Sequence, residues 1–523
     1  MEMFLHVIIS LIVAFQICGY TLFFDREISF FACILFALCI IFVYWGVRGI
    51  VRLLDWGAGK VILSFASSEE AVNRKKKTLY VFSGLLVIGI LAELIVFLAY
   101  YPGIYSQDVV QCWRQSLDLG AQKSDLHSFL YLCLLAIFSH LTNNIVIVTV
   151  FFALSFAIVF ALFMTYLWKN GLRFGYVLCS TICFYCFPNN IYMTVALWKD
   201  VPFTIALMSL TYALVKWVFE PERVKNSIGC LLHLSISAVL VACFRSNGMT
   251  ILAALFIFFG FRWFCKRSEW KMFAVLSATV TAVLVFKGPV FSALGVDRGP
   301  EGFACVPFID AVWANAYYGA DLPAEVEQEL SEIIMADDWK KEYDEGYANV
   351  YIWKDAYWNE NLSFKKSVDW YKWCLSNHPV LTIKARLTKT DFLWNYFMCD
   401  EAYLSYNCDF GATQNPQASE FGWYYFEGTQ GLRNAFAKFF DSSHNLSFLY
   451  RGAIHLTIWL ILILELRKRN KAAVVVILPM LINTLALFMA CCYSDYRFIW
   501  NMEVMSFFIV PVYLLTIGKH RKG

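Results

Sequence analysis

The stretch "YYPGIYSQDVVQCWRQ", residues 100–115, directly follows an apolar run over residues 79–100. That run has the length that an α-helix needs to cross a bilayer, about 20 residues. Pro102 and Gly103 then form a turn signal, and the acid Asp108 follows. This order predicts a membrane-spanning helix with a carboxylate just beyond one of its ends.

The whole composition agrees with a membrane protein. The chain has 523 residues, of which 59% are hydrophobic and 16% are charged. Soluble domains carry about 25% charged residues. The net charge of +3 does not indicate a partner of either sign, and no nucleic-acid-binding signature is present. We therefore predict an all-α polytopic membrane protein.

Apolar segments recur along the chain. They lie near residues 3–24, 28–47, 79–100, 127–141, 145–167, 174–197, 201–219, 227–244, 248–264, 271–293, 447–465, 472–491 and 497–516. Between the second and third segments the chain is rich in Lys and Arg, so the positive-inside rule places this loop in the cytoplasm. The third segment then runs outward, and Asp108 emerges on the outer side.

Segment 127–141 is short and contains His127 and His140. The basic loop after Trp168 is predicted to be cytoplasmic, so an odd number of crossings must separate it from Asp108. We interpret 127–141 as a juxtamembrane or re-entrant helix, which leaves about twelve transmembrane helices and two cytoplasmic termini. The predicted units are an N-terminal transmembrane module (1–293) with a first outer loop (101–126), a mostly helical extracytoplasmic domain (294–446) and C-terminal transmembrane helices (447–523).

Polar residues collect in four places that this topology puts on the outer side. They are "YSQDVVQCWRQ…SDLH", "LWKD", "FRSNG" and "DYRF", which supply Asp108, Gln111, Arg114, Asp125, His127, Lys199, Asp200, Arg245, Asn247, Tyr496 and Arg497. Charge at membrane depth is costly and tends to mark function.

Each of these places also has a structural interpretation. Asp108 suits the N-terminus of a helix dipole, and Asp200 before Pro202 suits a helix N-cap. A Ser-Asn-Gly turn accounts for Asn247, and Asp495 could pair locally with Arg497. These alternatives stay open at the level of sequence.

The combination of one carboxylate and several cations fits sugar transfer from a lipid phosphate. A carboxylate such as Asp108 can take the proton of an acceptor hydroxyl as that hydroxyl attacks the anomeric carbon. Arg or Lys can stabilise the leaving phosphate, for which Arg245, Lys199 and Arg497 are the candidates. A single general base implies direct displacement with inversion.

The chain resembles the GT-C superfamily of polyprenyl-phosphate-dependent glycosyltransferases, which includes the protein mannosyltransferases. The resemblance rests on "YSQD…SDLHSF", with Asp108 at the acidic position of the first outer loop. In order along the chain, "YPGIYSQD", "LWKD", "FRSNG" and "DYRF" are also similar to the Y-P-G-x-x-S-x-D, W-K-D, R-x-N-G and Y-R elements of a bacterial multi-spanning family. His127 is followed by Ser-Phe where the better-known members have Pro-Pro, and Asp108 by Val where the mannosyltransferases have Glu.

The resemblance implies a glycosyltransferase of the bacterial plasma membrane with an extracytoplasmic catalytic face. Its donor would be a sugar on polyprenyl (undecaprenyl) phosphate, and its acceptor a cell-envelope glycopolymer or lipid. Asp108 would be the base, and the other ten polar residues named above would bind substrate. No cofactor is identified, and a divalent cation stays open. The alternatives are a polysaccharide ligase or polymerase with a lipid diphosphate donor, a transporter or flippase, and a non-catalytic scaffold.

Overall fold

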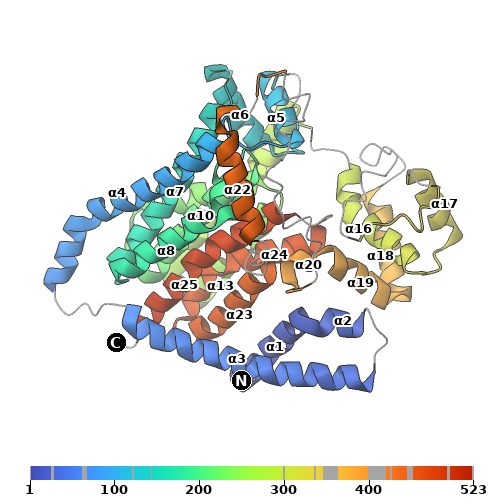
Figure 1. Ribbon diagram of the computed structural model, residues 1–523, viewed down its shortest axis with the longest axis horizontal. Coiled ribbons are helices and arrows are strands. Elements are labelled where there is room, and N and C mark those ends of the chain that lie inside the picture. The colour runs from blue at the N-terminus through green and yellow to red at the C-terminus, as the bar shows by residue number, and fades with distance from the viewer. Residues whose placement is uncertain are drawn as a thin grey trace.

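Helices make up nearly all of the regular structure in the computed structural model (Figure 1). The structure describes residues 2–24, 29–61, 68–120, 123–142, 144–297, 301–334, 337–345, 363–397, 420–423, 427–443, 451–491 and 495–520. Named strands are absent from these ranges, and the isolated bridges between described residues include Ile104 with Ala196 and Ser124 with Asp297. The predicted all-α class is therefore confirmed for the described part of the chain.

The helix bounds are as follows. They are α1 Glu2–Ala14, α2 Tyr20–Phe23, α3 Phe30–Val61, α4 Ser68–Ala99, α5 Gln107–Leu117, α6 Phe129–Leu141, α7 Val146–Lys169, α8 Phe174–Cys186, α9 Pro188–Thr194, α10 Asp200–Phe219, α11 Pro221–Asn226, α12 Ile228–Phe244, α13 Gly248–Cys265, α14 Trp270–Val285, α15 Phe291–Leu294, α16 Glu301–Tyr317, α17 Ala324–Ile333, α18 Phe364–Asn377, α19 Pro379–Lys389, α20 Asp391–Trp394, α22 Gln430–Ser443, α23 Gly452–Arg469, α24 Leu478–Ala490 and α25 Trp500–His520, with short 3₁₀ segments η8 Lys471–Val476 and η9 Tyr496–Phe498.

Eight helical stretches in the described residues are long and apolar enough to cross a membrane. They are Met3–Phe23, Phe30–Val61, Asn73–Ala99, Val146–Lys169, Asp200–Phe219, Gly248–Cys265, Arg267–Leu294 and Tyr496–Ile517. Four shorter apolar helices, α6, α8, α12 and α24, accompany them. The chain is thus a multi-pass membrane protein by the length and composition of its helices, and the number of twelve crossings stays a prediction.

Two of the predicted segments have features of their own. Helix α6 has 13 residues, so it is about 20 Å long, which is short of the roughly 30 Å hydrocarbon core. The segment expected to run without a break over 174–197 is interrupted, because α8 ends at Cys186 and α9 begins at Pro188. Proline disfavours the helical conformation of the residue before it, and Phe187 is extended, with φ −77° and ψ 117°.

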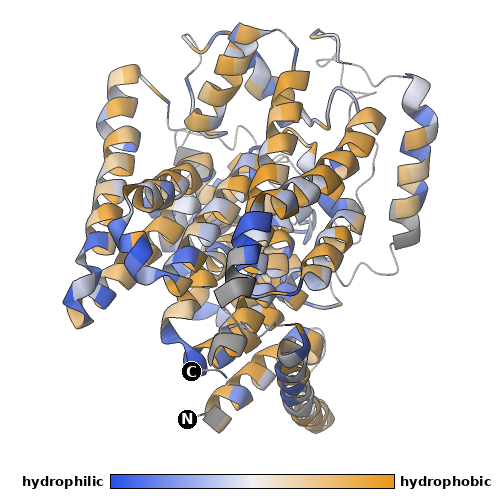
Figure 2. Ribbon diagram, turned by 90° about the vertical axis from the view of Figure 1, so that its left-hand side faces the viewer, coloured by the Kyte–Doolittle hydropathy of each residue, from blue (hydrophilic) through white to orange (hydrophobic). Residues whose placement is uncertain are grey.

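The bundle is organised around α25. Almost the whole of this helix is buried, and its Phe508 stacks on Phe163 of α7 with ring centroids 4.3 Å apart. In Figure 1, α4 and α7 run along one side of α25, and α1 and α3 cross below it. Figure 2 shows apolar residues along most helices and hydrophilic residues at the lower ends near the termini.

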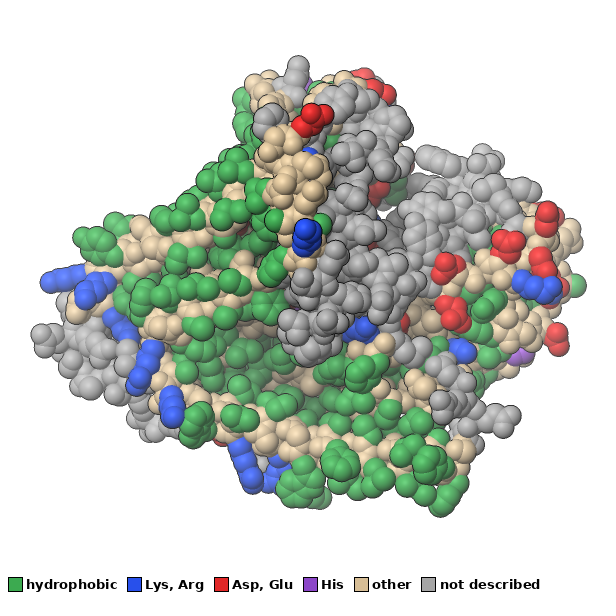
Figure 3. All heavy atoms as spheres, viewed as in Figure 1, with side chains coloured by type: hydrophobic (Ala, Val, Ile, Leu, Met, Phe, Trp, Pro, Cys, Tyr) green, Lys and Arg blue, Asp and Glu red, His purple; other side chains and the backbone are tan. Residues whose placement is uncertain are grey.

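The charges on the visible face are unevenly distributed (Figure 3). Lys and Arg side chains follow the lower left edge in Figure 3, whereas Asp and Glu gather on the right and at the top. Such an asymmetry is the pattern on which the positive-inside rule depends. The assignment of the basic end to the cytoplasm stays a prediction.

Residues 294–446 include a group of helices with a core of its own. Helices α16 to α19 lie at the right of Figure 1 and bury Trp313, Leu330 and Cys374 in a separate apolar cluster. Arg386 of α19 attaches this group to the bundle, because its guanidinium donates to carbonyl oxygens at the end of α24, including that of Cys491 at 2.7 Å. Helix α22 returns to the bundle, where Arg433 donates to the carbonyl of Ala99 at 3.1 Å.

Candidate functional site

The loop between α4 and α5 fixes the position of Asp108. The peptide between Tyr101 and Pro102 is cis, and Gly103 has φ of 143°, a conformation that favours glycine. Thr149 of α7 donates its hydroxyl to the carbonyl of Pro102 at 2.8 Å. These contacts end α4 sharply and turn the chain back over the bundle.

The same loop pairs with the segment before α10. The amide of Ile104 donates to the carbonyl of Val195 at 3.1 Å, and the amide of Leu197 donates to the carbonyl of Ile104 at 2.8 Å. This short parallel bridge holds two distant parts of the chain side by side. It brings the start of α5, which carries Asp108, close to the start of α10, which carries Lys199.

Asp108 faces a cation from the end of the chain. Its Oδ2 lies 3.3 Å from an Nη of Arg497, with side-chain exposures of 50% for Asp108 and 14% for Arg497. Partial burial alone raises the pKa of the Asp108 carboxyl, but the charges of Arg497 and Lys199 outweigh it and hold that pKa below its ordinary value. A helix-dipole role is compatible with this position but does not account for Arg497.

Lys199 is the residue just before α10 and is largely buried. Its ammonium donates to the carbonyl of Leu126 at 3.5 Å, and no carboxylate of a described residue lies within ion-pairing distance. Burial lowers the pKa of Lys199 to about 8, with the Arg245 charge acting in the same direction. At neutral pH the site therefore holds a positive charge without a directly paired anion.

His127 lies close to both Lys199 and Asp108. Burial lowers its pKa to about 4, with the nearby charge of Lys199 contributing. Its imidazole is therefore neutral at physiological pH and can both donate and accept one hydrogen bond.

Asp200 and Arg245 form a buried ion pair. Asp200 is the first residue of α10, and Arg245 follows the last residue of α12 with an extended backbone. Because the Asp200 carboxylate binds the Arg245 guanidinium, its side chain does not cap α10 as the N-cap interpretation expected. Arg245 also packs over Phe498, with its guanidinium carbon 5.0 Å from the ring centroid.

Arg497 makes the local ion pair that its sequence position suggested, and it also contacts Asp108. Its Nε lies 2.8 Å from Oδ2 of Asp495, which is the local ion pair, while an Nη group reaches Asp108. The Asp495 side chain also accepts from the backbone amide of Arg497 at 2.9 Å. Asp495 therefore holds the arginine in the orientation in which it meets Asp108.

The turn between α12 and α13 depends on Gly248. A Cβ atom added there would overlap the carbonyl oxygen of Val241 and lie 2.6 Å from its carbonyl carbon. We expect Gly248→Ala to lower the free energy of unfolding by about 1–3 kcal/mol, because the backbone has to move. Thermal unfolding in detergent measures this. Gly229→Ala in α12 is the control, since its nearest neighbour would be 3.9 Å away; equal melting temperatures for the two variants would contradict the prediction.

The other predicted site residues have different surroundings. Gln111 is exposed, and Arg114 pairs with Glu420 at 2.6 Å. Asp125 accepts from the amide of Phe129 at 2.8 Å and pairs with Lys287 at 3.2 Å. These contacts give Arg114 and Asp125 structural roles next to the cluster.

Asn247 and Tyr496 point into the bundle and join a buried polar network. Asn247 donates to Asn483 at 2.5 Å, and Asn483 donates to Asn501 at 3.0 Å. The Tyr496 hydroxyl donates to the carboxylate of Glu503. Their hydrogen bonds fix the last helices below the cluster.

Asn483 and Asn501 of this network were not predicted from the sequence, and neither was a third buried amide, Asn190. Asn190 of α9 is fully buried and accepts from the indole of Trp500 at 3.0 Å. Two adjacent amides after a proline, in "FPNN" (residues 187–190), were the available signal.

The cluster as a whole contains three carboxylates, three cations and one neutral imidazole. Asp108, Asp200 and Asp495 face Lys199, Arg245 and Arg497, with His127 beside them. No group of three or more His, Cys, Asp or Glu side chains arranged to hold a metal ion occurs among the described residues. Compared with known proteins, the chain matches no family model, no curated protein and no solved structure.

Proposed function

We propose that the protein is a membrane glycosyltransferase that transfers a sugar from a polyprenyl phosphate to a hydroxyl of an envelope polymer or lipid. The observation that carries this proposal is the half-exposed Asp108 carboxylate among Arg497, Lys199 and Arg245 at the ends of membrane-spanning helices. An accessible base beside buried cations suits a reaction in which a proton leaves one group while negative charge grows on another.

In the proposed reaction, Asp108 accepts the proton of the acceptor hydroxyl. The hydroxyl oxygen bonds to the anomeric carbon, and the bond from that carbon to the donor phosphate oxygen breaks. The electron pair leaves with the polyprenyl phosphate, whose charge increases. Lys199 supports this leaving group, because its ammonium has no carboxylate of a described residue within ion-pairing distance. Of the other two carboxylates in the cluster, Asp200 is buried against Arg245 and Asp495 binds Arg497, so we assign Asp108 as the single base, and direct displacement with one base gives inversion.

The low pKa of Asp108 is compatible with its role as a base. It keeps the carboxylate ionised in the free enzyme, although a weakly basic group is a poor proton acceptor. A donor phosphate that contacts Arg497 would share the guanidinium charge. The pKa of Asp108 would then rise when the donor is bound, at the step that needs a base.

The pKa of Lys199 predicts an alkaline limit to activity. Below about pH 8 Lys199 is an ammonium group, and above it the charge on the leaving-group side is lost. We expect kcat/KM to fall as the pH rises through this value, since kcat/KM reports the free enzyme. In Lys199→Arg this fall in kcat/KM, the alkaline limb of the pH profile, should move to higher pH, because guanidinium stays protonated. An unchanged alkaline limb in Lys199→Arg would exclude Lys199 as its cause.

A transporter of an anionic lipid is the second candidate. The observation that favours it is the polar network of Asn247, Asn483 and Glu503, which continues from the cluster into the bundle. Ionisable groups inside membrane bundles are common in transport pathways. A transporter moves its lipid without breaking the sugar–phosphate bond, and that difference separates the two functions.

The test uses the purified full-length protein in liposomes with a panel of labelled polyprenyl-phosphate sugars and polyprenyl-diphosphate sugars. Chromatography of the lipid products shows whether a monophosphate or a diphosphate is released. Release of polyprenyl phosphate supports the proposal. Release of diphosphate alone supports the ligase or polymerase reading, and movement of intact lipid between leaflets without cleavage supports transport.

A further inference from the structure

A groove opens on the bundle far from the cluster, between α4, α7 and α10. It has a volume of about 430 Å³. On α4 it lies near Lys75, whereas the cluster begins beyond Ala99. At 1.5 Å per residue this separation is about 36 Å, so the groove is at the opposite end of the membrane-spanning helices.

One end of the groove is cationic. Lys75 and Lys76 of α4 and Lys169 of α7 line it, and none lies within ion-pairing distance of a carboxylate of a described residue. Glu220, which interacts electrostatically with Lys169, accepts from the Tyr166 hydroxyl at 3.0 Å and pairs with Arg223 at 2.7 Å. Because Arg223 offsets Glu220, the rim keeps a positive excess.

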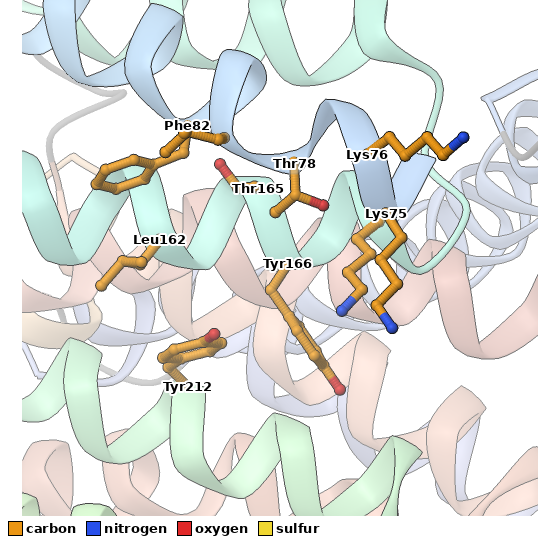
Figure 4. Close-up of a pocket in the computed structure, with 10 residues that line it drawn as sticks. Lys75, Lys76, Thr78, Phe82, Leu162, Thr165, Tyr166 and Tyr212 are labelled. Carbon is orange, nitrogen blue, oxygen red and sulfur yellow. The ribbon is translucent and has the colours of Figure 1, made fainter. Parts of the chain in front are cut away.

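The other end of the groove is apolar. Leu79, Phe82 and Leu162 form its walls, and Leu79 and Leu162 belong to the exposed apolar surface of the bundle, with exposures of 69% and 40%. Figure 4 shows Phe82 and Leu162 at one end and the Tyr166 hydroxyl and Lys75 toward the other. The groove therefore combines a cationic end with an apolar end.

A buried threonine hydroxyl without a hydrogen-bond partner among the described residues lies between the two ends. Thr165 of α7 lines the groove, is 4% exposed, and its hydroxyl makes no hydrogen bond with a described residue. Buried hydroxyl groups normally have a partner. An oxygen of a bound ligand is the kind of group that would satisfy it.

We propose that this groove binds one anionic glycerophospholipid. The phosphate lies between Lys75 and Lys169, and an acyl chain follows Leu79, Phe82 and Leu162 along the outside of the bundle. A lipid is favoured over a soluble phosphate because the apolar wall is continuous with the surface that faces the membrane. Basic pockets between membrane helices are suited to anionic headgroups. The site is independent of the proposed sugar transfer.

The test is native mass spectrometry of the delipidated full-length protein, titrated with dioleoyl phosphatidylglycerol or with dioleoyl phosphatidylcholine. We expect tighter binding of the anionic lipid to the wild type. Each lysine near a lipid surface contributes about fivefold, so Lys75→Gln/Lys169→Gln should lose roughly 25-fold in affinity for phosphatidylglycerol. Lys77→Gln/Lys471→Gln, which removes two exposed lysines that do not line the groove, should keep the wild-type affinity.

Two results would overturn the proposal. One is equal binding of the two lipids by the wild type, and the other is the same loss of affinity in both double variants. A third arm addresses the source of the phosphate. Soluble glycerol phosphate should not compete at concentrations comparable to the lipid, and competition as strong as that of phosphatidylglycerol would show that the apolar wall contributes nothing.

Discussion

Asp108→Asn should abolish sugar transfer almost completely while leaving the protein folded. The amide keeps the size of the side chain and one hydrogen-bond acceptor for Arg497, but it cannot take a proton from the acceptor. General base catalysis contributes about 10²–10⁴-fold to rate, and kcat should fall by that amount. The measurement is release of polyprenyl phosphate from a labelled donor, with thermal unfolding measured on the same samples.

Glu420→Gln is the matched control. It also removes a carboxylate that pairs with an arginine of α5, the helix that carries Asp108, but this pair, with Arg114, lies outside the cluster and is exposed. Exposed pairs contribute little to stability, about 0–1 kcal/mol, so activity and melting temperature should stay near those of the wild type. Equal turnover by Asp108→Asn and the wild type would remove Asp108 from the mechanism and leave the scaffold reading in place.

The sequence was sufficient for the helical class because apolar runs of membrane length leave the backbone few alternatives. It also singled out Asp108, His127, Lys199, Arg245 and Arg497, which come together in the structure although the chain separates them widely. The topology argument placed these residues at helix ends on one side of the membrane, and residues so placed can meet although they are distant in the chain.

The sequence could not show which of these charged residues pair with one another. Asp200 suited an N-cap on local grounds, yet it pairs with Arg245, 45 residues away. Arg497 has a local acid in Asp495 and still reaches Asp108, 389 residues away. Such pairings depend on how α10, α12 and α25 pack, and local spacing contains no information about that.

The sequence also did not predict the break in the helix after α8. Pro188 is visible in the sequence, but the apolar residues on both sides predicted one continuous segment. In the structure the break allows α9 to turn Asn190 toward Trp500 of α25. Apolar content indicated membrane depth here and did not indicate continuity of the helix.

Asp200→Asn should destabilise the protein strongly, because it leaves the Arg245 guanidinium without its carboxylate. The two side chains are 2% and 12% exposed. Removing one partner of a buried pair costs about 3–5 kcal/mol, which is a large part of a typical stability of about 5–15 kcal/mol. Unfolding of the detergent-solubilised protein, followed by circular dichroism against temperature or added denaturing detergent, measures the loss.

The double variant Asp200→Asn/Arg245→Gln distinguishes the contribution of the ion pair to stability from a role of Arg245 in sugar transfer. If Arg245 serves mainly to neutralise Asp200, removing both charges should restore part of the stability lost in Asp200→Asn.

Arg245→Lys keeps a cation for Asp200 but loses the bidentate guanidinium, so a phosphate-binding role predicts a loss of transfer with little loss of stability. Full activity of Arg245→Lys would exclude bidentate phosphate binding, and an unchanged melting temperature in Asp200→Asn would exclude a stabilising pair. These variants therefore measure separately the contribution of Arg245 to the ion pair with Asp200 and its proposed contact with the donor phosphate.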